Sequence, residues 1–400
     1  MPSLDDVINT GTKRFGKGRI ARGLRDLHES AETVYDYARL LTGLFPLDFA
    51  IGGGVPFNTM TMFFGPQESG KSTTAYLAAR SLSRFCTNPG CLKPLTLCTC
   101  ESPKVQKTFL AQFEGHPPGP LWFNLLGYDP ETHMVVSVPD YGEQGCELIE
   151  AAVKSDDCGL VIVDSIGGLI PKAELVCSYE DDVIGRRAKL ITRLVNRLAP
   201  ILVNELRRGH YVAVIFINQV RSIIGGYGPS EGLPGGYALK HAVRLAVRFG
   251  KLSVTTSDRG EEDTPMIFRM SCSMLGGQSK QQLFVMAGKA EATIALEEYK
   301  GHTVGSSIDA SVVLQYGLEL GVIEEDDKSG VWIPGTHYKF PRKMDFKQTM
   351  ATGKYGDEEW ADDVIRFLVL REARRRGIET ALGAGRNIVR LAAKEVVADA

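Results

Sequence analysis

The sequence predicts an α/β fold in which a mostly parallel central sheet is flanked by helices. Three apolar runs are typical of buried strands, residues 60–64, 159–164 and 212–219, and the last two end in polar residues. Apolar runs without alternation are typical of strands covered on both faces, as in parallel sheets. The first run leads directly into a glycine-rich loop and then into a helix-forming stretch, residues 72–79.

Length and composition set broad limits on the class of protein. Four hundred residues predict two or three folded units, and 44% hydrophobic with 24% charged residues is ordinary for a soluble globular chain. No apolar run approaches the length of a membrane span, and the N-terminus lacks the apolar core of a signal peptide. We therefore expect a cytoplasmic protein without a membrane partner. With a net charge of −2, any binding of nucleic acid must depend on local positive charge.

The strongest local motif is the glycine-rich loop, which matches the pattern GxxxxGK[ST] and predicts a triphosphate site. Its glycines let backbone N–H groups approach phosphate oxygens, and the following helix N-terminus favours negative charge. Lys71 is expected to reach the terminal phosphates of ATP, and the Ser72 hydroxyl to hold Mg²⁺. The alternative is a glycine turn before an ordinary helix. The predicted nucleotide-binding residues are Gly65, Pro66, Gln67, Glu68, Ser69, Gly70, Lys71, Ser72 and Thr73.

Two further strand ends carry polar residues that suit the same site. Asp164 ends the second apolar run and is the expected second ligand of Mg²⁺, although a surface aspartate would look the same in isolation. Gln219 ends the third run, where it could contact the γ-phosphate. The next segment, residues 222–236, holds six glycines and two prolines and is too long for a plain connector. We expect this loop to be functional.

Six further blocks, in the same order along the chain, resemble the bacterial and phage RecA family. They are residues 14–18 (RFGKG), 42–48 (TGLFPLD), 139–144 (PDYGEQ), 163–174 (VDSIGGLIPKAE), 216–221 (FINQVR) and 235–240 (GGYALK). The resemblance covers roughly residues 11–340 and is more specific than any one motif. It implies a recombinase that forms a helical filament on single-stranded DNA, hydrolyses ATP bound between protomers, and promotes pairing and strand exchange with double-stranded DNA.

The resemblance also implies a domain organisation. Residues 1–41 correspond to a helical arm that docks on the next protomer, residues 42–301 to the RecA-type ATPase core, and residues 302–400 to a small α/β C-terminal domain. Near the end of the chain, Arg371 and the run 374–376 could gather duplex DNA or form a solvated helix face, and we favour the latter.

Three catalytic or nucleotide-binding assignments rest on the resemblance. Glu114, at the end of the expected strand 107–114, corresponds to the glutamate that positions or activates the attacking water; the alternative is a solvated glutamate. Trp122 falls where the family places an aromatic residue near the adenine, but it could equally be a core residue. The family's pair of lysines that reach the neighbouring protomer's ATP is reduced here to Lys289, with Ala287 at the other position.

Two loops in this family line the filament axis and bind DNA. The first corresponds to residues 175–185 and the basic residues that follow, and the second is the glycine-rich loop. Basic residues and apolar wedges suit sequence-independent binding of a single strand, whereas a solvated helix face is the alternative for the basic cluster. The predicted DNA-binding residues are Ile184, Arg186, Arg187, Lys189, Arg221, Ile223, Ile224, Gly225 and Gly226.

Half of the eight cysteines lie in a turn-rich insertion, residues 85–105. Cys86, Cys91, Cys98 and Cys100 would complete a tetrahedral zinc shell, although their spacing departs from a regular CxxC…CxxC pattern. Free cysteines in a loop are the alternative, and His116 is a possible substitute ligand. The insertion and the divergent C-terminal stretch favour a bacteriophage origin.

Two other classes of function share parts of this pattern. A hexameric replicative helicase would have the same nucleotide site but not the blocks at 171–174, 216–219 and 235–240. A DNA-binding accessory protein could keep the fold and lack turnover, an alternative that the single lysine at 289 makes worth testing.

Overall fold

The computed structural model describes residues 39–115, 117–178, 185–222, 231–232, 236–257, 264–274, 289–298 and 301–383, with residues 6, 9–10 and 13–14. By compactness the chain divides into two units, Met1–Arg39 and Leu40–Ala400. The second unit contains the central sheet and the helices that cover it. In the described part of the chain, no helix is both long and apolar enough to cross a membrane.

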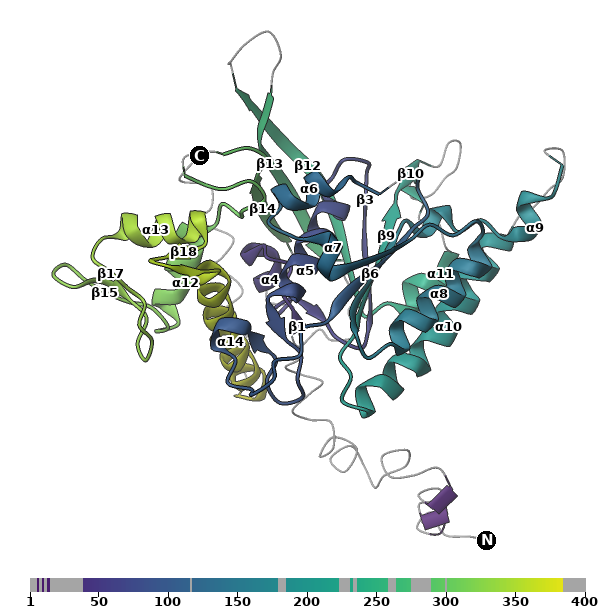
Figure 1. Ribbon diagram of the computed structural model, residues 1–400, viewed down its shortest axis with the longest axis horizontal. Helices are drawn as coiled ribbons and strands as arrows, with labels where there is room; N and C mark the ends of the chain where they lie inside the picture. The colour runs from purple at the N-terminus through teal and green to yellow at the C-terminus, as the bar shows by residue number, and fades with distance from the viewer. Residues whose placement is uncertain are drawn as a thin grey trace. The chain divides into compact units, whose positions relative to one another are not determined.

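An eight-stranded mixed sheet forms the centre of this unit (Figure 1). Five consecutive pairings, from β12 to β7, are parallel, and β13 and β14 extend the sheet antiparallel at one edge. The mostly parallel sheet predicted from the apolar runs is therefore confirmed. In spatial order the strands are β14 (Lys289–Ala295), β13 (Thr264–Met274), β12 (Leu245–Ser257), β3 (Met60–Gly65), β9 (Ala213–Gln219), β8 (Cys158–Asp164), β6 (Lys107–Gln112) and β7 (Met134–Ser137).

Helices cover both faces of the sheet. On one face, alternate strand residues such as Met62, Val161 and Val214 pack in one cluster with apolar side chains of three helices. These helices are α8 (Gly142–Lys154), α10 (Arg186–Arg207) and α11 (Gly236–Ala242). On the other face, α5 (Lys71–Ser83) lies against β3, β6, β8 and β9. Burial on both faces explains why these strands are apolar throughout.

Short elements connect these layers. They are β1 (Arg39–Leu40), α4 (Phe45–Ala50), β2 (Val55–Pro56), β4 (Phe85–Cys86), β5 (Lys93–Pro94), the 3₁₀ turn η1 (Leu95–Leu97), α6 (Pro120–Leu125), α7 (Pro130–His133), the 3₁₀ turn η2 (Ile166–Gly168), α9 (Lys172–Leu175), β10 (Arg221–Ser222) and β11 (Glu231–Gly232). Leu40 falls within the predicted helical arm but lies in a strand, because its strand pairs with β2 and Leu40 is buried there.

The C-terminal region builds a second core. Its elements are α12 (Ala310–Glu319), β15 (Glu324–Asp326), β16 (Gly330–Trp332), β17 (Lys339–Phe340), α13 (Lys343–Thr352), β18 (Lys354–Tyr355), β19 (Glu358–Glu359) and α14 (Ala361–Gly383). Their apolar side chains cluster with Leu41 and Phe45, so α4 belongs to this core. In this region the buried guanidinium of Arg366 donates to Asp309 at 2.9 Å and also pairs with Asp362.

Candidate nucleotide-binding site

The phosphate loop joins β3 to α5, and two of its glycines have positive φ angles, 154° for Gly65 and 89° for Gly70. A Cβ atom on Gly65 would lie 2.2 Å from the carbonyl oxygen of Phe249, and one on Gly70 would lie 2.8 Å from the Phe268 ring. Both positions therefore require glycine for conformation and for space. The loop is packed against β12 and β13, which fixes its backbone at the N-terminus of α5.

Lys71 begins α5 and is only 6% exposed. Its ammonium group donates to the Pro66 carbonyl at 2.5 Å and to the Ser69 hydroxyl at 3.3 Å. Burial lowers the pKa of Lys71, and the nearby carboxylates of Asp164 and Glu114 oppose that shift. The ammonium group of Lys71 therefore lies over the loop and binds two loop oxygens. Phosphate oxygens could replace these two acceptors, so the loop suits a polyphosphate.

Asp164 ends β8 and lies beside α5. Its carboxylate accepts a hydrogen bond from the Tyr76 hydroxyl at 3.2 Å and another from Ser72. Burial raises the pKa of Asp164, while the hydrogen bond from Ser72 and the charge of Lys71 lower it. The Ser72 hydroxyl and an Asp164 oxygen therefore stand together as hard oxygen donors, the set that suits Mg²⁺.

Glu114 follows β6 by two residues and is held by residues at the ends of β8 and β9. It pairs with the hydroxyl of Ser165 after β8 and accepts from the Gln219 side-chain amide at 2.8 Å. The Glu114 side chain is exposed. An exposed, oriented carboxylate next to Lys71 is available to a water molecule, as a general base must be.

The structure thus brings together the residues predicted at four strand ends. Gly65 pairs with Gln219 in register, and Gln112 pairs with Asp164. Because β3, β9, β8 and β6 are adjacent and parallel, their carboxyl ends converge on one edge of the sheet, where ligands bind in open α/β folds.

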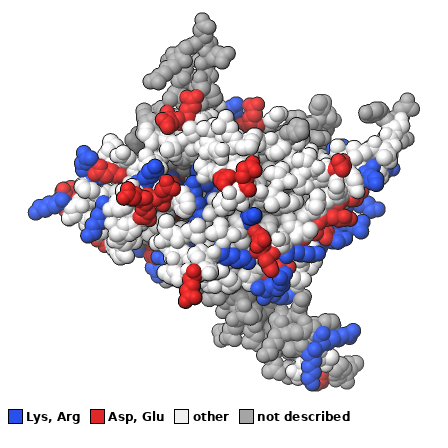
Figure 2. All heavy atoms as spheres, viewed as in Figure 1, with Lys and Arg blue, Asp and Glu red and all other residues white. Residues whose placement is uncertain are grey.

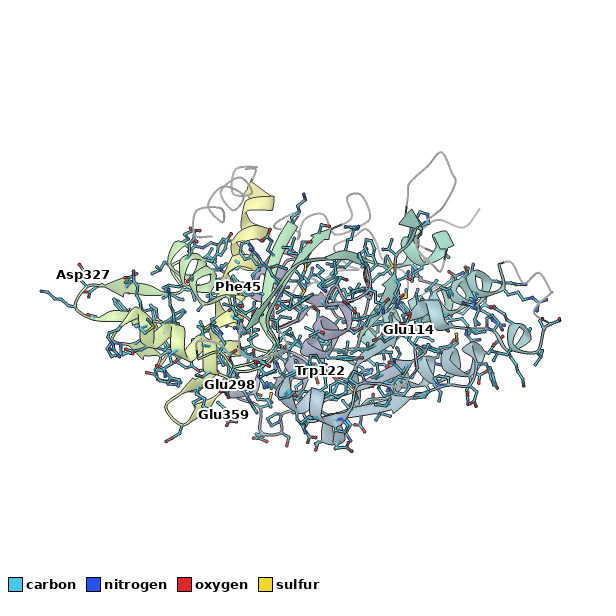
Figure 3. The ribbon with its side chains drawn as sticks, turned by 90° about the horizontal axis from the view of Figure 1, so that it is seen from above. Phe45, Glu114, Trp122, Glu298, Asp327 and Glu359 are labelled. Carbon is cyan, nitrogen blue, oxygen red and sulfur yellow. The ribbon has the colours of Figure 1, made fainter. Side chains whose placement is uncertain are left out.

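Trp122 lies in α6 and is half-buried, so it is not a core residue. Its neighbour Phe123 is buried and contacts the Tyr76 ring at 5.0 Å between ring centres, which places α6 against α5. Figure 3 labels Trp122 in this region. Its contact with adenine stays a prediction.

Two residues of the site were not predicted from the sequence. Tyr76 lies four residues after Ser72, on the same face of α5, and this helical spacing was the available signal. Ser165 directly follows Asp164 and holds Glu114, but nothing in the sequence indicates that pairing.

The predicted DNA-binding residues are only partly within the described residues. Arg187 pairs with Glu174 at 2.5 Å, and Arg186 donates to the Ala173 carbonyl at 3.1 Å, so both tie α10 to the α9 segment; Lys189 is exposed. In Figure 2 acidic and basic side chains alternate over the α8 and α10 region of the face shown. For Arg221 only the backbone, in β10, is described. Outside the described residues lie Ile184, Ile223, Ile224, Gly225, Gly226 and His116.

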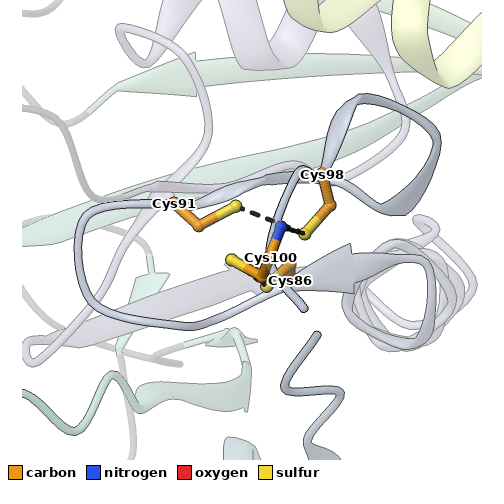
Figure 4. A group of neighbouring side chains, drawn as sticks. All are labelled: Cys86, Cys91, Cys98 and Cys100. Atoms are coloured by element: carbon orange, nitrogen blue, oxygen red, sulfur yellow. Dashed lines mark hydrogen bonds between the residues drawn. The ribbon is translucent and has the colours of Figure 1, made fainter. Parts of the chain in front are cut away.

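Lys289 is exposed at the start of β14, separated from β3 by β12 and β13. The four cysteines of the insertion, by contrast, are brought together (Figure 4).

A parallel sheet that carries a glycine-rich loop, a lysine, a hydroxyl and a carboxylate at adjacent strand ends defines a nucleotide-binding protein of the P-loop class.

Comparison with known proteins identifies the family. The family model for the RecA N-terminal domain matches residues 100–265. Protein RecA of Campylobacter lari is 32% identical over 336 residues, which are 82% of this chain and 82% of that protein. Protein RecA of Clostridium novyi is 31% identical over 83% of this chain and 81% of its own length. Protein RecA of Thermus aquaticus is 34% identical, over 62% of this chain and 64% of its own length, slightly less than two thirds. The chain belongs to the RecA family and is a RecA-like recombinase of recombination and repair.

Proposed function

We propose that this chain is a DNA-dependent ATPase that polymerises on single-stranded DNA and promotes homologous pairing and strand exchange. ATP would bind at the phosphate loop, between protomers of a helical filament, and its hydrolysis to ADP and phosphate would release the DNA. Family membership and the geometry of the site support this proposal, and the family favours it over a ring-forming helicase.

The phosphate loop and the neighbouring strand ends would hold the nucleotide. The loop backbone and Lys71 would bind the phosphates, while Ser72 and Asp164 would hold Mg²⁺, which supplies positive charge against the phosphate oxygens. Tyr76 and Ser72 both donate to the Asp164 carboxylate and so orient it at this site. Trp122 would border the adenine.

Glu114 would orient the attacking water and accept its proton. Its two partners, Ser165 and Gln219, each donate to a different oxygen of the carboxylate. Such positioning is a main contribution of a protein to phosphoryl transfer, where the chemistry needs little covalent participation.

One observation supports the coupling of hydrolysis to DNA. The side chain that anchors Glu114 is Gln219, the last residue of β9, and three residues later the glycine-rich loop begins. A change at the γ-phosphate that displaces Glu114 would therefore displace the start of that loop. The loop, together with Arg186, Arg187 and Lys189, would bind the DNA backbone, and the glycines and isoleucines would accommodate the bases.

The protein would act in the cytoplasm, which for a phage-encoded chain is that of the host, and phage origin stays a prediction. Residues 1–41, 42–301 and 302–400 would form the arm, the core and the C-terminal domain. Lys289 would act on the ATP of a neighbouring protomer.

The decisive experiment measures ATP hydrolysis with and without single-stranded DNA. We expect strong stimulation by DNA in the wild type and none in Lys71→Ala, which would lack the phosphate-binding cation. Hydrolysis that is absent in the wild type, or indifferent to DNA, would reject the proposal in favour of an accessory protein.

Gln219→Ala tests the coupling itself. We expect ATP binding, followed with a fluorescent analogue, to stay within a factor of about two, and stimulation by DNA to fall at least tenfold, the size of effect common for a positioning residue. Gln315→Ala on the exposed face of α12 is the matched control and should behave as wild type. Equal stimulation of ATP hydrolysis by DNA in both variants would show that the Gln219–Glu114 contact does not couple hydrolysis to DNA binding.

A further inference from the structure

The four cysteines of the insertion come from separate turns yet meet at one point. Cys86 ends β4, Cys91 lies in the turn after it, and Cys98 and Cys100 follow η1. The Cys91 and Cys98 sulfurs are 3.6 Å apart, and those of Cys86 and Cys100 are 4.0 Å apart. All four sulfurs lie within 4.8 Å of one another (Figure 4).

These distances discriminate between the chemistries open to four thiols. A disulfide needs sulfurs at about 2 Å, far closer than either pair. A tetrahedral ion with metal–sulfur bonds of about 2.3 Å sets its ligand sulfurs about 3.8 Å apart, between the two measured separations. The Cys100 backbone N–H also donates to the Cys98 sulfur at 3.4 Å, an interaction that stabilises a thiolate.

We propose that Cys86, Cys91, Cys98 and Cys100 bind one structural zinc ion. Four sulfur donors exclude hard cations such as Mg²⁺ and Ca²⁺, and leave zinc or iron as the tetrahedral ions of this ligand type. A shell of four protein ligands has no open position, so the ion would stabilise the insertion and would not act on a substrate. Binding converts the thiols to thiolates and releases their protons to solvent.

The insertion buries few residues that could stabilise it without a metal ion. Between Thr87 and Lys104, only Thr87 and Pro94 are buried. A segment that buries so little apolar surface does not form a core of its own, which is the situation in which small folds use a metal or disulfides.

The segment nevertheless occupies a defined place against the C-terminal region. Leu97 packs on the C-terminal core, and the Phe85 and Phe367 rings lie 6.1 Å apart between centres. Arg84, just before β4, pairs with Asp363 at 2.9 Å and lies over the Trp360 ring. The zinc ion would therefore hold the insertion in the shape that contacts α14.

The first test is the metal content of the full-length protein, purified after growth with zinc supplied and measured by mass spectrometry. We expect about one zinc per chain in the wild type and less than a tenth of that in Cys91→Ser and Cys98→Ser, since loss of one thiolate opens the shell. Cys177→Ser is the matched control, because Cys177 is a half-buried thiol outside the cluster, and it should keep its zinc. Zinc retained in the two cluster variants, iron in its place, or a metal-free wild type would overturn the proposal.

The second test uses the folded wild type, so that it does not depend on whether a variant folds. Titration with an organic mercurial should release zinc in proportion to the modification of four thiols. Hydrogen exchange should then rise in residues 86–100 and at the start of α14, and stay unchanged in β8. Release of zinc without faster exchange in residues 86–100 would overturn the structural role, and thiols already blocked as disulfides would overturn the site.

Discussion

At the scale of single residues, Asp48 is a carboxyl group that is almost completely removed from water. It is 1% exposed in α4, and its side chain accepts the Thr42 backbone N–H at 2.9 Å. Burial raises the pKa of Asp48 to about 7, against the opposing effect of hydrogen bonds from Thr42 and Gly43. The folded state therefore binds this proton more tightly than the unfolded state does.

The sign of the resulting pH dependence follows from linkage. A raised pKa stabilises the folded state below the unfolded value of 3.8, and that stabilisation is lost as pH rises to about 7. A tenfold difference in proton affinity between the folded and unfolded states corresponds to about 1.4 kcal/mol, so the predicted loss is several kcal/mol. Because the asparagine of Asp48→Asn cannot ionise, we expect the free energy of unfolding of this variant to lack this pH-dependent contribution.

The measurement is the midpoint of thermal unfolding from pH 4 to pH 8 for both proteins. The midpoint of thermal unfolding of the variant, relative to that of the wild type, should rise as pH rises towards 7. Above pH 7 the difference between the two midpoints should be constant. A difference that is independent of pH would contradict the raised pKa.

At the scale of elements, α14 is attached through a buried charge network. Arg366 is almost fully buried and pairs with Asp309 at the start of α12 and with Asp362 in its own helix. Asp309 also accepts the backbone N–H of Phe45 at 3.3 Å, which links α12, α14 and α4. Removing the cation would leave two buried carboxyl groups without their partner.

We therefore predict that Arg366→Ala destabilises the C-terminal region by about 3–5 kcal/mol, the usual cost of breaking a buried pair. Arg342→Ala is the matched control, because Arg342 pairs with Asp345 on the exposed start of α13, where solvent screens the charges. Denaturant unfolding followed by the fluorescence of the C-terminal tryptophans measures both. Similar losses of unfolding free energy in the two variants would show that burial of the network adds nothing to the stability of the C-terminal region.

At the scale of the whole molecule, the position of Lys289 predicts that the active site is shared. Within one chain it lies on the edge strand β14, which β12 and β13 separate from β3. If it serves the neighbour's ATP, Lys71→Ala and Lys289→Ala should each be inactive, while their equal mixture regains activity. Random mixing in a head-to-tail filament makes roughly a quarter of the interfaces complete.

DNA-stimulated ATP hydrolysis of the mixture is the measurement. The control mixes Lys289→Ala with the double variant carrying both substitutions, in which no interface is complete and no activity should return. A mixture of the single variants that stays inactive would place the action of Lys289 within its own chain, or remove it from the site.

The sequence was sufficient for the parts of the structure that follow local rules. Unbroken apolar runs predicted β3, β8 and β9, because strands covered on both faces have no polar side, and the loop motif fixed the start of α5. The resemblance led to Glu114, which the strand pattern alone could not single out.

Other features depend on contacts between distant segments and had no local signal. The pairing of Ser165 with Glu114 depends on the register of β6 against β8. The burial of Arg366 runs against the usual preference of arginine for the surface, and it is possible only because Asp309 and Asp362 surround it. Neither could be derived from periodicity or composition.

The bond between Gln219 and Glu114 has a thermodynamic consequence. If nucleotide and DNA act on the same strand end, their binding is linked, and linkage is reciprocal: the factor by which ATP tightens DNA is the factor by which DNA tightens ATP. Bound DNA would then raise the apparent affinity for nucleotide, and depletion of ATP would weaken the binding of DNA by that same factor. One hydrogen bond at the end of β9 would in this way make the energy state of the cell a determinant of how long the protein stays on its DNA.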